Sequence, residues 1–298
     1  MQGLRECLAG EQFVLTAELE PPKGASLERV LRYASALRDK VHAVNITDSP
    51  MANMRMSPIA VAHIVRRDAR LDAIFHLTCR DRNVIGLQSE LLGAAALGVR
   101  TILVLTGDPP ARGDHPTARG VFEVDSVGLV RIAHQLNQGR DLQGNELRGA
   151  PEFFIGVAAN PAAPNLDQEI WKLLQKLECG AHFIQTQPVY EVEVLARFVE
   201  RIKQFHVPVI AGVLPLKSYK MTRHIIDSIP GIHIPSWLER MMAASGRAAG
   251  VQVARDLLTQ LPAVVQGAHV MPVGSAGIVL DVVEGYDLKW PEPAISAS

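Results

Sequence analysis

The sequence predicts an α/β protein that folds as a single (β/α)8 TIM barrel, and three observations carry this prediction. First, short runs rich in valine, isoleucine and leucine alternate with amphipathic helical patterns along the 298-residue chain. Second, these runs are apolar at nearly every position, which is typical of parallel strands buried on both faces. Third, no GxGxxG follows the first run, although a doubly wound dinucleotide-binding sheet would carry one there.

Eight strands are expected, and turn residues mark several of their ends. They cover Phe13–Leu19, His42–Asp48, Asp72–Cys79, Thr101–Asp108, Phe153–Asn160, His182–Gln187, Pro208–Pro215 and Ala268–Gly274. Pro21 and Pro22 close the first strand, and Pro109 and Pro110 close the fourth, TILVLTGD. Proline cannot continue a strand ladder, so each pair fixes a boundary.

Helices are expected between the strands, because apolar residues recur there every three or four positions. They cover Ser26–Lys40, Ser57–Asp68, Arg82–Gly98, Asp125–Gly139, Asn165–Gly180, a segment that contains Leu195 and Ile202, Tyr219–Ile229, Ser236–Ala243, Ala248–Leu261 and Ile278–Glu284. Ser26 is expected to cap the first helix, and Gly98 to end the third. Asn165 and Gln168 have the spacing of a capping box.

Two polar segments interrupt this alternation without ending it. Residues 111–120, after the fourth strand, indicate a long loop, and residues 139–151 indicate a polar surface insertion. Strand and helix patterns resume after both segments. We therefore expect residues 1–298 to form one domain.

Composition excludes several classes of partner. Lysine and arginine number 30 against 31 aspartates and glutamates, and aromatic residues make up 5% of the chain. Without a basic run or stacking aromatics, nucleic acid and anionic membrane surfaces are poor partners. Cys7, Cys79 and Cys179 form no CxxC, and no 18-residue apolar window or signal core is present. We expect a cytoplasmic protein without disulfides or membrane insertion.

A ring of polar residues stands at the expected carboxyl ends of the strands, where α/β barrels hold their active sites. Its members are Glu18, Glu20, Asn45, Thr47, Asp48, His76, Thr78, Thr106, Asp108, Asn160, Gln185 and Gln187. No nucleophile–base triad is visible among them. His76, Cys79 and Asp108 come nearest to a zinc set, but a zinc site is the weaker interpretation, and we expect no metal.

Glu18 and Asp108 are the strongest catalytic candidates in this ring. Glu18 shares its parity with Val14 and Thr16, so it points into the barrel if Val14 does. A carboxyl in an apolar interior favours its protonated form, which a general acid near neutral pH requires. The alternatives are that Glu18 lies at an edge in water and that Asp108 is only a turn residue.

The same residues carry a resemblance to the methylenetetrahydrofolate reductases, which are flavin-dependent (β/α)8 barrels. The resemblance extends from about Phe13 to about Gly274. It rests on TAELEPP at 16–22, HLTC at 76–79, LTGDPP at 105–110, GAHFIQTQ at 180–187 and PSW at 235–237. Each motif is modest alone, but their order and spacing make the resemblance specific.

The resemblance implies the reaction and a role for each matching residue. Reduced flavin would convert 5,10-methylenetetrahydrofolate to 5-methyltetrahydrofolate, with Glu18 as the general acid that protonates N10. Asp108 would lie beside flavin and pterin, favouring hydride donation and stabilising the cationic iminium. Gln187 and Tyr219 would contact the folate. The flavin-binding positions would be Thr47, His76, Thr106, Gly107, Asp108, Ser126, Asn160 and Lys176, with Lys176 suited to a phosphate.

Several positions depart from the family pattern. Thr106 stands in place of an arginine and Asn160 in place of a tyrosine. Lys172 and Gln175 replace residues that hold the distal part of FAD, so FAD is favoured by resemblance while FMN stays open. Met221, Ile225 and Ser275 replace a glutamine, a phenylalanine and an arginine that contact the nicotinamide donor or folate. NADH or NADPH as direct donor is therefore uncertain, and we expect electrons from a partner subunit, as in the reductases of acetogens.

Other interpretations remain. A flavin-free pterin-binding methyltransferase also uses a barrel with Asp and Asn at strand ends, but it gives Glu18 no role as an acid. A non-catalytic subunit would not need Glu18, Asp108 and Gln187 together. An aldolase-like lyase requires a Schiff-base lysine inside a strand, and no expected strand interior contains lysine. The sequence leaves homo-oligomerisation open.

Overall fold

The computed structural model describes residues 3–229, 231–272 and 277–290. Its sheet is a closed barrel of eight parallel strands in sequence order, which confirms the predicted (β/α)8 architecture. The strands are β1 (Val14–Leu19), β2 (Ala43–Ile46), β3 (Asp72–Thr78), β4 (Thr101–Leu105), β5 (Phe154–Ala159), β6 (Phe183–Pro188), β7 (Val209–Val213) and β8 (Gly267–Val270). Closure is made by β8 against β1, with Thr16 opposite His269.

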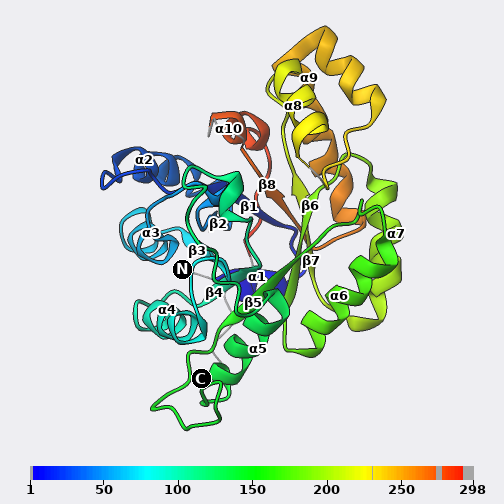
Figure 1. Cartoon of the computed structure of the whole chain (residues 1–298). Coiled ribbons are helices and arrows are strands. Elements are labelled where there is room, and N and C mark those ends of the chain that lie inside the picture. The colour runs from blue at the N-terminus through cyan, green and yellow to red at the C-terminus, as the bar shows by residue number, and fades with distance from the viewer. Residues whose placement is uncertain (1–2, 230, 273–276, 291–298) are drawn as a thin grey trace, which may run out of the picture.

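Helices surround the barrel and connect its strands (Figure 1). They are α1 (Leu4–Ala9), α2 (Glu28–Leu37), α3 (Pro58–Ile64), α4 (Val84–Ala96), α5 (Ser126–Asn137), α6 (Leu166–Glu178), α7 (Val192–Ile202), α8 (Tyr219–Ser228), α9 (Ser236–Gln260) and α10 (Gly277–Val283). Short helical turns add η1 (Pro50–Ala52), η2 (Val65–Ala69), η3 (Pro110–Arg112), η4 (Lys203–Phe205) and η5 (Leu261–Ala263). A single parallel sheet covered by helices buries both of its faces, which explains the continuous apolar runs.

The amino-terminal end of the barrel is closed by α1, an element that the sequence patterns did not predict. Leu4, Cys7 and Leu8 of this helix pack against inward-facing strand residues such as Ile74 and Phe183. Asp72 holds the start of the helix: its carboxylate accepts a hydrogen bond of 2.9 Å from the Leu4 amide and pairs with Arg66. A short buried helix therefore fills the end opposite the expected site.

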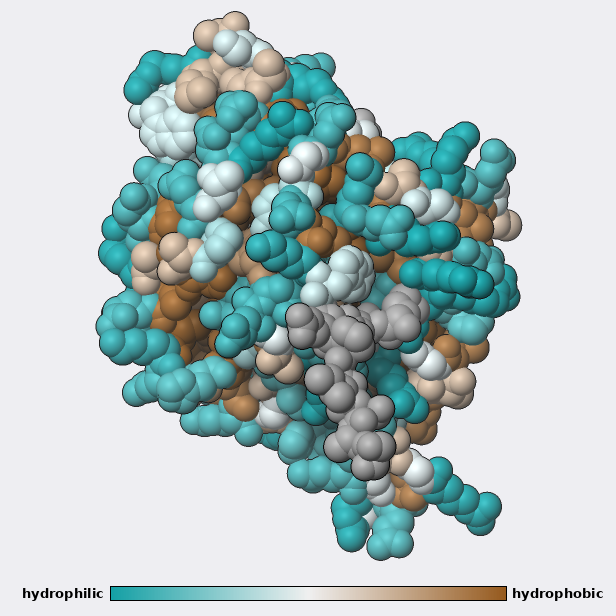
Figure 2. Space-filling view, turned by 180° about the vertical axis from the view of Figure 1, so that it is seen from behind, coloured by the Kyte–Doolittle hydropathy of each residue, from teal (hydrophilic) through white to brown (hydrophobic). Residues whose placement is uncertain are grey.

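The larger core lies between the barrel and its surrounding helices, where side chains such as Phe75, Phe153 and Phe198 are fully buried. The face opposite to that of Figure 1 is covered mostly by hydrophilic side chains, with apolar atoms in the hollows between them (Figure 2). No helix among the described residues is long and apolar enough to cross a membrane.

Some predicted boundaries were wrong. Ser26 does not cap a helix, because α2 begins at Glu28 with Leu27 at its N-cap. The fourth strand ends at Leu105, so Thr106 to Asp108 lie in the loop that follows it. The two helices predicted at 236–243 and 248–261 form α9, kinked at Gly246, whose φ is 52° and ψ −129°. β8 ends at Val270, and Val273 to Ser275, which carried the end of the predicted strand and one departure from the family, lie outside the described residues.

The two polar segments lie where the alternation placed them. Residues 111–120 begin with the last two residues of η3 and continue as a largely exposed loop toward α5. Within 139–151, Arg140 and Glu146 make an isolated antiparallel bridge, and the segment is solvent-facing along most of its length. Asn165 caps α6 as predicted, because its side chain accepts a hydrogen bond from the Gln168 amide.

Candidate active site

Two adjoining cavities open at the carboxyl ends of the strands. The larger, of 660 Å³, is called here the outer cavity; its polar lining comprises Thr106, Asp108, Arg112, Ser126, Asn160, Glu169, Lys176, Gln187 and Ser228. The central cavity, of 240 Å³, has Glu18, Thr47, His76, Gly107, Asp108, Gln185 and Gln187 among its lining residues. Because Asp108 and Gln187 line both, the two cavities adjoin. Their combined polar and apolar walls are typical of a ligand site.

All but one of the candidate residues meet at these cavities. The exception is Tyr219, which begins α8, is exposed, and donates from Oη to Glu239 Oε1 at 3.4 Å. It lines neither cavity. Met221 and Ile225, on the same helix, are buried in the main core.

Glu18 and Asp108 both line the central cavity, and they reach it from strand positions three apart around the barrel. Glu18 is the penultimate residue of β1, and its side chain is 25% exposed. Asp108 follows β4, and its side chain is 44% exposed, with Arg112 Nη1 3.7 Å from its Oδ1. The cavity between two carboxyl groups can hold a ligand that takes a proton from one and has its positive charge stabilised by the other.

His269 lies beneath Glu18, and sequence reasoning missed it. Its Nε2 is 4.0 Å from Glu18 Oε2, and its Nδ1 is 2.9 Å from Thr16 Oγ1. The ring is fully buried, and Nε2 has no hydrogen-bond partner among the described residues. The register of β8 on β1, which pairs Thr16 with His269, was the signal that could have found it.

A second buried polar group lies below the mouth and joins three strands. Asn45 Nδ2 donates to Gln185 Oε1 at 2.7 Å and to His76 Nε2 at 3.1 Å. Burial lowers the pKa of His76 from 6.5 to about 4, although the charge of Glu18 opposes the change. At neutral pH His76 therefore presents an uncharged imidazole to the central cavity.

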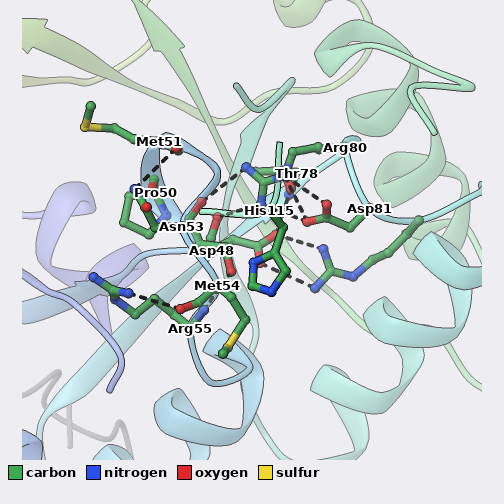
Figure 3. Close-up of polar contacts among 12 residues, drawn as sticks. Asp48, Pro50, Met51, Asn53, Met54, Arg55, Thr78, Arg80, Asp81 and His115 are labelled. Carbon is green, nitrogen blue, oxygen red and sulfur yellow. Dashed lines mark hydrogen bonds and ion pairs between the residues drawn. The ribbon is translucent and has the colours of Figure 1, made fainter. Parts of the chain in front are cut away.

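The loop after β2 is held over the mouth by a buried ionic cluster (Figure 3). Asp48, whose side chain is 3% exposed, accepts from the Thr78 amide and hydroxyl, both at 2.9 Å, and from Arg82 Nη1 at 2.8 Å. Arg80 donates to the Ser49 carbonyl at 3.1 Å. Several charge-assisted bonds offset the cost of burying this aspartate.

This cluster fixes a strained turn. Ser49, Met51 and Ala52 all have positive φ, and Met51 lines both cavities. Asp114, in the loop after β4, binds the Met54 amide at 3.0 Å and Lys23 Nζ at 2.5 Å. Residues from three loops are thus held together at the rim.

Gly107 is required by its position in the loop after β4. Its φ is +94°, and a Cβ would lie 3.0 Å from Thr78 Cβ and 3.1 Å from Arg80 Cβ. Side chains other than hydrogen would clash there and strain the backbone. The glycine lets the chain turn back closely against β3, so that Asp108 reaches the cavity.

Lys176 provides a partly buried cation in the wall of the outer cavity. Its Nζ donates to the Ala158 carbonyl at 2.8 Å, and burial lowers its pKa. Ser126, at the start of α5, lines the same cavity, and its amide donates a hydrogen bond of 3.2 Å to Thr106 Oγ1. Asn160 ties this wall to the chain after α8 through a 2.8 Å bond to the Gly231 carbonyl.

These residues fit a flavin. Thr47 Oγ1 and Asn45 Oδ1 are buried without hydrogen-bond partners among the described residues, so polar groups of a ligand can satisfy Thr47 from the central cavity. The outer cavity supplies Lys176 for a phosphate. Within the described ranges, no three His, Cys, Asp or Glu side chains are grouped as metal ligands.

Comparison with known families matches residues 3–286 to the family described as methylenetetrahydrofolate reductase. The chain is 26% identical over 275 residues to the 5,10-methylenetetrahydrofolate reductase of Salmonella typhimurium, covering 86% of this chain and 85% of that protein. It is 29% identical over 234 residues to methylenetetrahydrofolate reductase 2 of Schizosaccharomyces pombe. That match covers 70% of this chain but only 34% of the yeast protein.

Solved structures share the fold at low sequence identity. A Clostridium thermocellum protein that binds two copies of 5-methyl-5,6,7,8-tetrahydrofolic acid has a TM-score of 0.66 and 16% identity, covering 94% of this chain and 95% of that chain. EDTA monooxygenase (EmoA) from Chelativorans sp. BNC1 has a TM-score of 0.57 and 12% identity, covering 92% and 93%. At these identities the likeness shows the barrel alone.

Proposed function

Because the chain belongs to the methylenetetrahydrofolate reductase family, we propose that it reduces 5,10-methylenetetrahydrofolate to 5-methyltetrahydrofolate with a bound flavin. Relatives that match most of the chain carry that activity in their names. The folate bound by the Clostridium thermocellum protein is the product of this reaction, which supports folate as the ligand class. In this proposal residues 1–298 form one flavin-binding domain.

The observation that carries the proposal is the placement of Glu18 and Asp108 around one cavity. Glu18 comes from β1 and Asp108 from the loop after β4, three strands away around the barrel and 90 residues later in the sequence. A packed core would not bring two carboxyl groups to a shared hollow. Reduction of a methylene bridge between two nitrogens needs such a pair, because one nitrogen must leave as a protonated amine and the carbon becomes cationic.

Glu18 is the general acid of the proposal. Its carboxyl group donates a proton to N10, and the bond between N10 and the methylene carbon breaks with its electron pair remaining on N10. The methylene carbon then shares a positive charge with N5 as an iminium ion. The apolar strand and the buried His269 ring under Glu18 hold its carboxyl at the cavity surface.

Asp108 and Gln187 bind and orient the substrate in the proposal. Both line the boundary between the outer and central cavities, where a ligand spanning the two must pass. The carboxylate of Asp108 stabilises the iminium ion, and the amide of Gln187 donates and accepts hydrogen bonds to the pterin ring.

The flavin, when bound, supplies the hydride that the methylene carbon accepts. Lys176 and Ser126 would hold its phosphate in the outer cavity, and Thr47, His76 and Gly107 would contact its ring in the central one. Thr106, Asn160 and Asp108 complete the set. FAD follows from the family resemblance, and the replacements at 172 and 175 leave FMN as the other form to be tested.

The chain lacks an aromatic residue at position 225, where the family resemblance places a contact to the nicotinamide donor or folate. Ile225 stands where the family has an aromatic ring, and it is buried in the core and lines neither the outer nor the central cavity. An aliphatic core residue offers no stacking platform for a nicotinamide. We therefore propose weak direct use of NADH or NADPH and electron delivery by a partner subunit, in the cytoplasm.

Purification with flavin analysis tests the proposal. The protein should show flavin absorbance or gain it with FAD or FMN, and mass spectrometry of the released cofactor should identify which. Glu18→Gln should keep flavin and lose at least a hundredfold in methylenetetrahydrofolate turnover, because general acid catalysis contributes about 10²–10⁴. Glu28→Gln, on the exposed face of α2, is the matched control.

Three results would contradict parts of this assignment. Substantial turnover by Glu18→Gln would remove Glu18 from the acid role. A colourless protein that transfers methyl groups would identify a flavin-free methyltransferase. Rapid flavin reduction by NADH in the isolated chain would refute the proposed partner subunit.

A further inference from the structure

Glu18 lines a second cavity besides the central one. This cavity, of 330 Å³, is called here the side cavity, and it is enclosed by the end of β1, the loop that follows it, α2 and Pro272 after β8. Glu18 lines both the side cavity and the central cavity, so its carboxyl group stands in the wall between them. In the proposed function, flavin and folate fill the central cavity. The side cavity then offers an approach to Glu18 from another direction.

The side cavity opens to solvent and has room for water. Lys23 and Glu20 at its rim have side chains that are 54% and 45% exposed. Holding one water takes only about 15 Å³ of such space, provided that polar groups are there to bind it. The charged rim and the Glu18 carboxyl supply those groups, so water can reach Glu18 through this cavity.

The polar groups around Glu18 are not satisfied by one another. His269 Nε2 is 4.0 Å from Glu18 Oε2, which is too long for a hydrogen bond, and it has no other partner among the described residues. Tyr33, on α2, lines the side cavity, and its Oη is buried, again without a partner in the described part of the chain. Buried polar groups are nearly always paired, with protein or with ordered water. A water held between Tyr33 and Glu18 would pair both.

We propose that the side cavity is the proton entry of the active site, with Tyr33 positioning the water that protonates Glu18. This inference rests on the proposed function, in which Glu18 gives one proton to N10 in each turnover and must regain it. The ionised carboxylate takes a proton from the positioned water, and that water recovers one from solvent along the side cavity. The step moves a proton only, and no electrons are transferred.

The filling of the central cavity makes this route necessary. Ligands there remove water from one face of Glu18, and loss of water favours the protonated carboxyl group. If Glu18 is ionised when the complex forms, the proton that it then takes up has to cross the side cavity. Tyr33 would act as a positioning residue, because it orients the water and does not touch the folate.

The groups that face Glu18 allow this transfer. Tyr33 from α2 is an uncharged donor, His269 lies beside it on β8, and burial keeps His76 of β3 neutral. At the rim, Lys23 pairs with Asp114 and Arg55 pairs with Glu20, both at 2.5 Å. These pairs neutralise two of the three rim cations and leave Arg29, which is exposed to solvent.

The test follows flavin reoxidation when the chemically reduced, flavin-loaded protein is mixed rapidly with 5,10-methylenetetrahydrofolate, from about pH 6 to about pH 9, in H2O and D2O. At the acid end Glu18 enters the complex protonated, so Tyr33→Phe should react at the wild-type rate. At the alkaline end proton uptake limits the reaction, so this variant should be about tenfold slower and show the larger solvent isotope effect. Tyr286→Phe, at a tyrosine that lines none of the three cavities, should follow wild type at every pH.

Val30→Phe tests the cavity itself, because it narrows the side cavity without removing the phenol of Tyr33. It should cause the same loss, confined to alkaline pH; where it does not fold, Tyr33→Phe decides alone. A pH-indicator dye gives a readout apart from turnover, since 5-methyltetrahydrofolate fills the central cavity of the reduced protein without reacting. Proton uptake from weakly buffered solution should then be about tenfold slower in both variants.

The possible outcomes separate this inference from the proposed function. Reoxidation profiles and proton-uptake rates equal to those of wild type would overturn the proton-entry assignment and leave the proposed function intact. An equal loss of rate at every pH would show a structural effect and also overturn the assignment. Failure of the wild-type flavin to be reoxidised by 5,10-methylenetetrahydrofolate would refute the proposed function, and this inference with it.

Discussion

Burial of His76 makes the stability of the protein sensitive to mild acid. Its pKa is lowered from 6.5 to about 4, so the folded chain leaves the ring neutral over a pH range in which the unfolded chain protonates it. Because the pKa of His76 is lower in the folded chain, the contribution of this ring to the free energy of unfolding is fully present above pH 6.5. That contribution is lost as the pH falls toward 4. The full difference in proton affinity corresponds to about 3 kcal/mol.

Between pH 7 and pH 5 this single ring should remove about 2 kcal/mol from the free energy of unfolding. The assay is urea unfolding, followed by circular dichroism, at several pH values for wild type and His76→Gln. The variant loses the bond from Asn45, which lowers stability at every pH, but it also lacks the titrating ring, so its stability should fall less steeply with acid.

His224→Gln supplies the matched control, because His224 is exposed on α8. Burial also lowers the pKa values of His42, which is buried, and His182, which is half-buried, but both rings titrate equally in all three proteins and cancel in the comparison. Parallel pH profiles for wild type and His76→Gln would refute the reasoning and would mean that the His76 ring is charged or solvated in the folded protein.

Three further predictions concern the mouth of the barrel. Asp108→Asn should weaken folate binding and raise the midpoint potential of the bound flavin by roughly 30 mV, which corresponds to about 1.4 kcal/mol in a two-electron couple. An unchanged potential in a spectroelectrochemical titration would contradict the argument that the Asp108 charge acts on the flavin. Lys176→Met should weaken flavin binding by about tenfold or more in fluorescence titration, because it removes the partly buried cation of the outer cavity; Lys203→Met, at an exposed lysine of η4, is its control. Gly107→Ala should lower the free energy of unfolding by about 2 kcal/mol, since φ is +94° and Cβ meets Thr78, and calorimetry that shows no loss would count against the close approach.

The sequence predicted the barrel well because its signals are long and periodic. Each strand is a buried apolar run and each helix has an apolar face, so the alternation survives errors of a few residues at the ends. The sequence did not predict helix α1, because it has only six residues, LRECLA, and is stabilised by packing under the strands rather than by a local pattern. Ser26 failed as a cap because α2 starts two residues later than the periodicity suggested.

The sequence predicted those residues of the candidate site that follow or end an apolar strand pattern. Glu18, Asp108 and Gln187 stand where apolar runs stop, and the closed barrel brings them to one hollow. His269 was missed because it lies inside its strand, and only the pairing of β8 with β1 places it under Glu18. The side cavity beside Glu18, between the end of β1 and α2, depends on how these two elements pack together, which no local pattern encodes.

The helix α1 seals the amino-terminal end of the barrel. Burial raises the pKa of the Cys7 thiol in this helix to about 11, so the thiol stays protonated and unreactive. In the proposed function, substrate and flavin bind at the opposite end of the barrel, in the outer and central cavities. Alterations at Leu4 or Leu8 should shorten the lifetime of the folded chain without altering turnover per intact molecule, which makes this end the natural place to engineer durability.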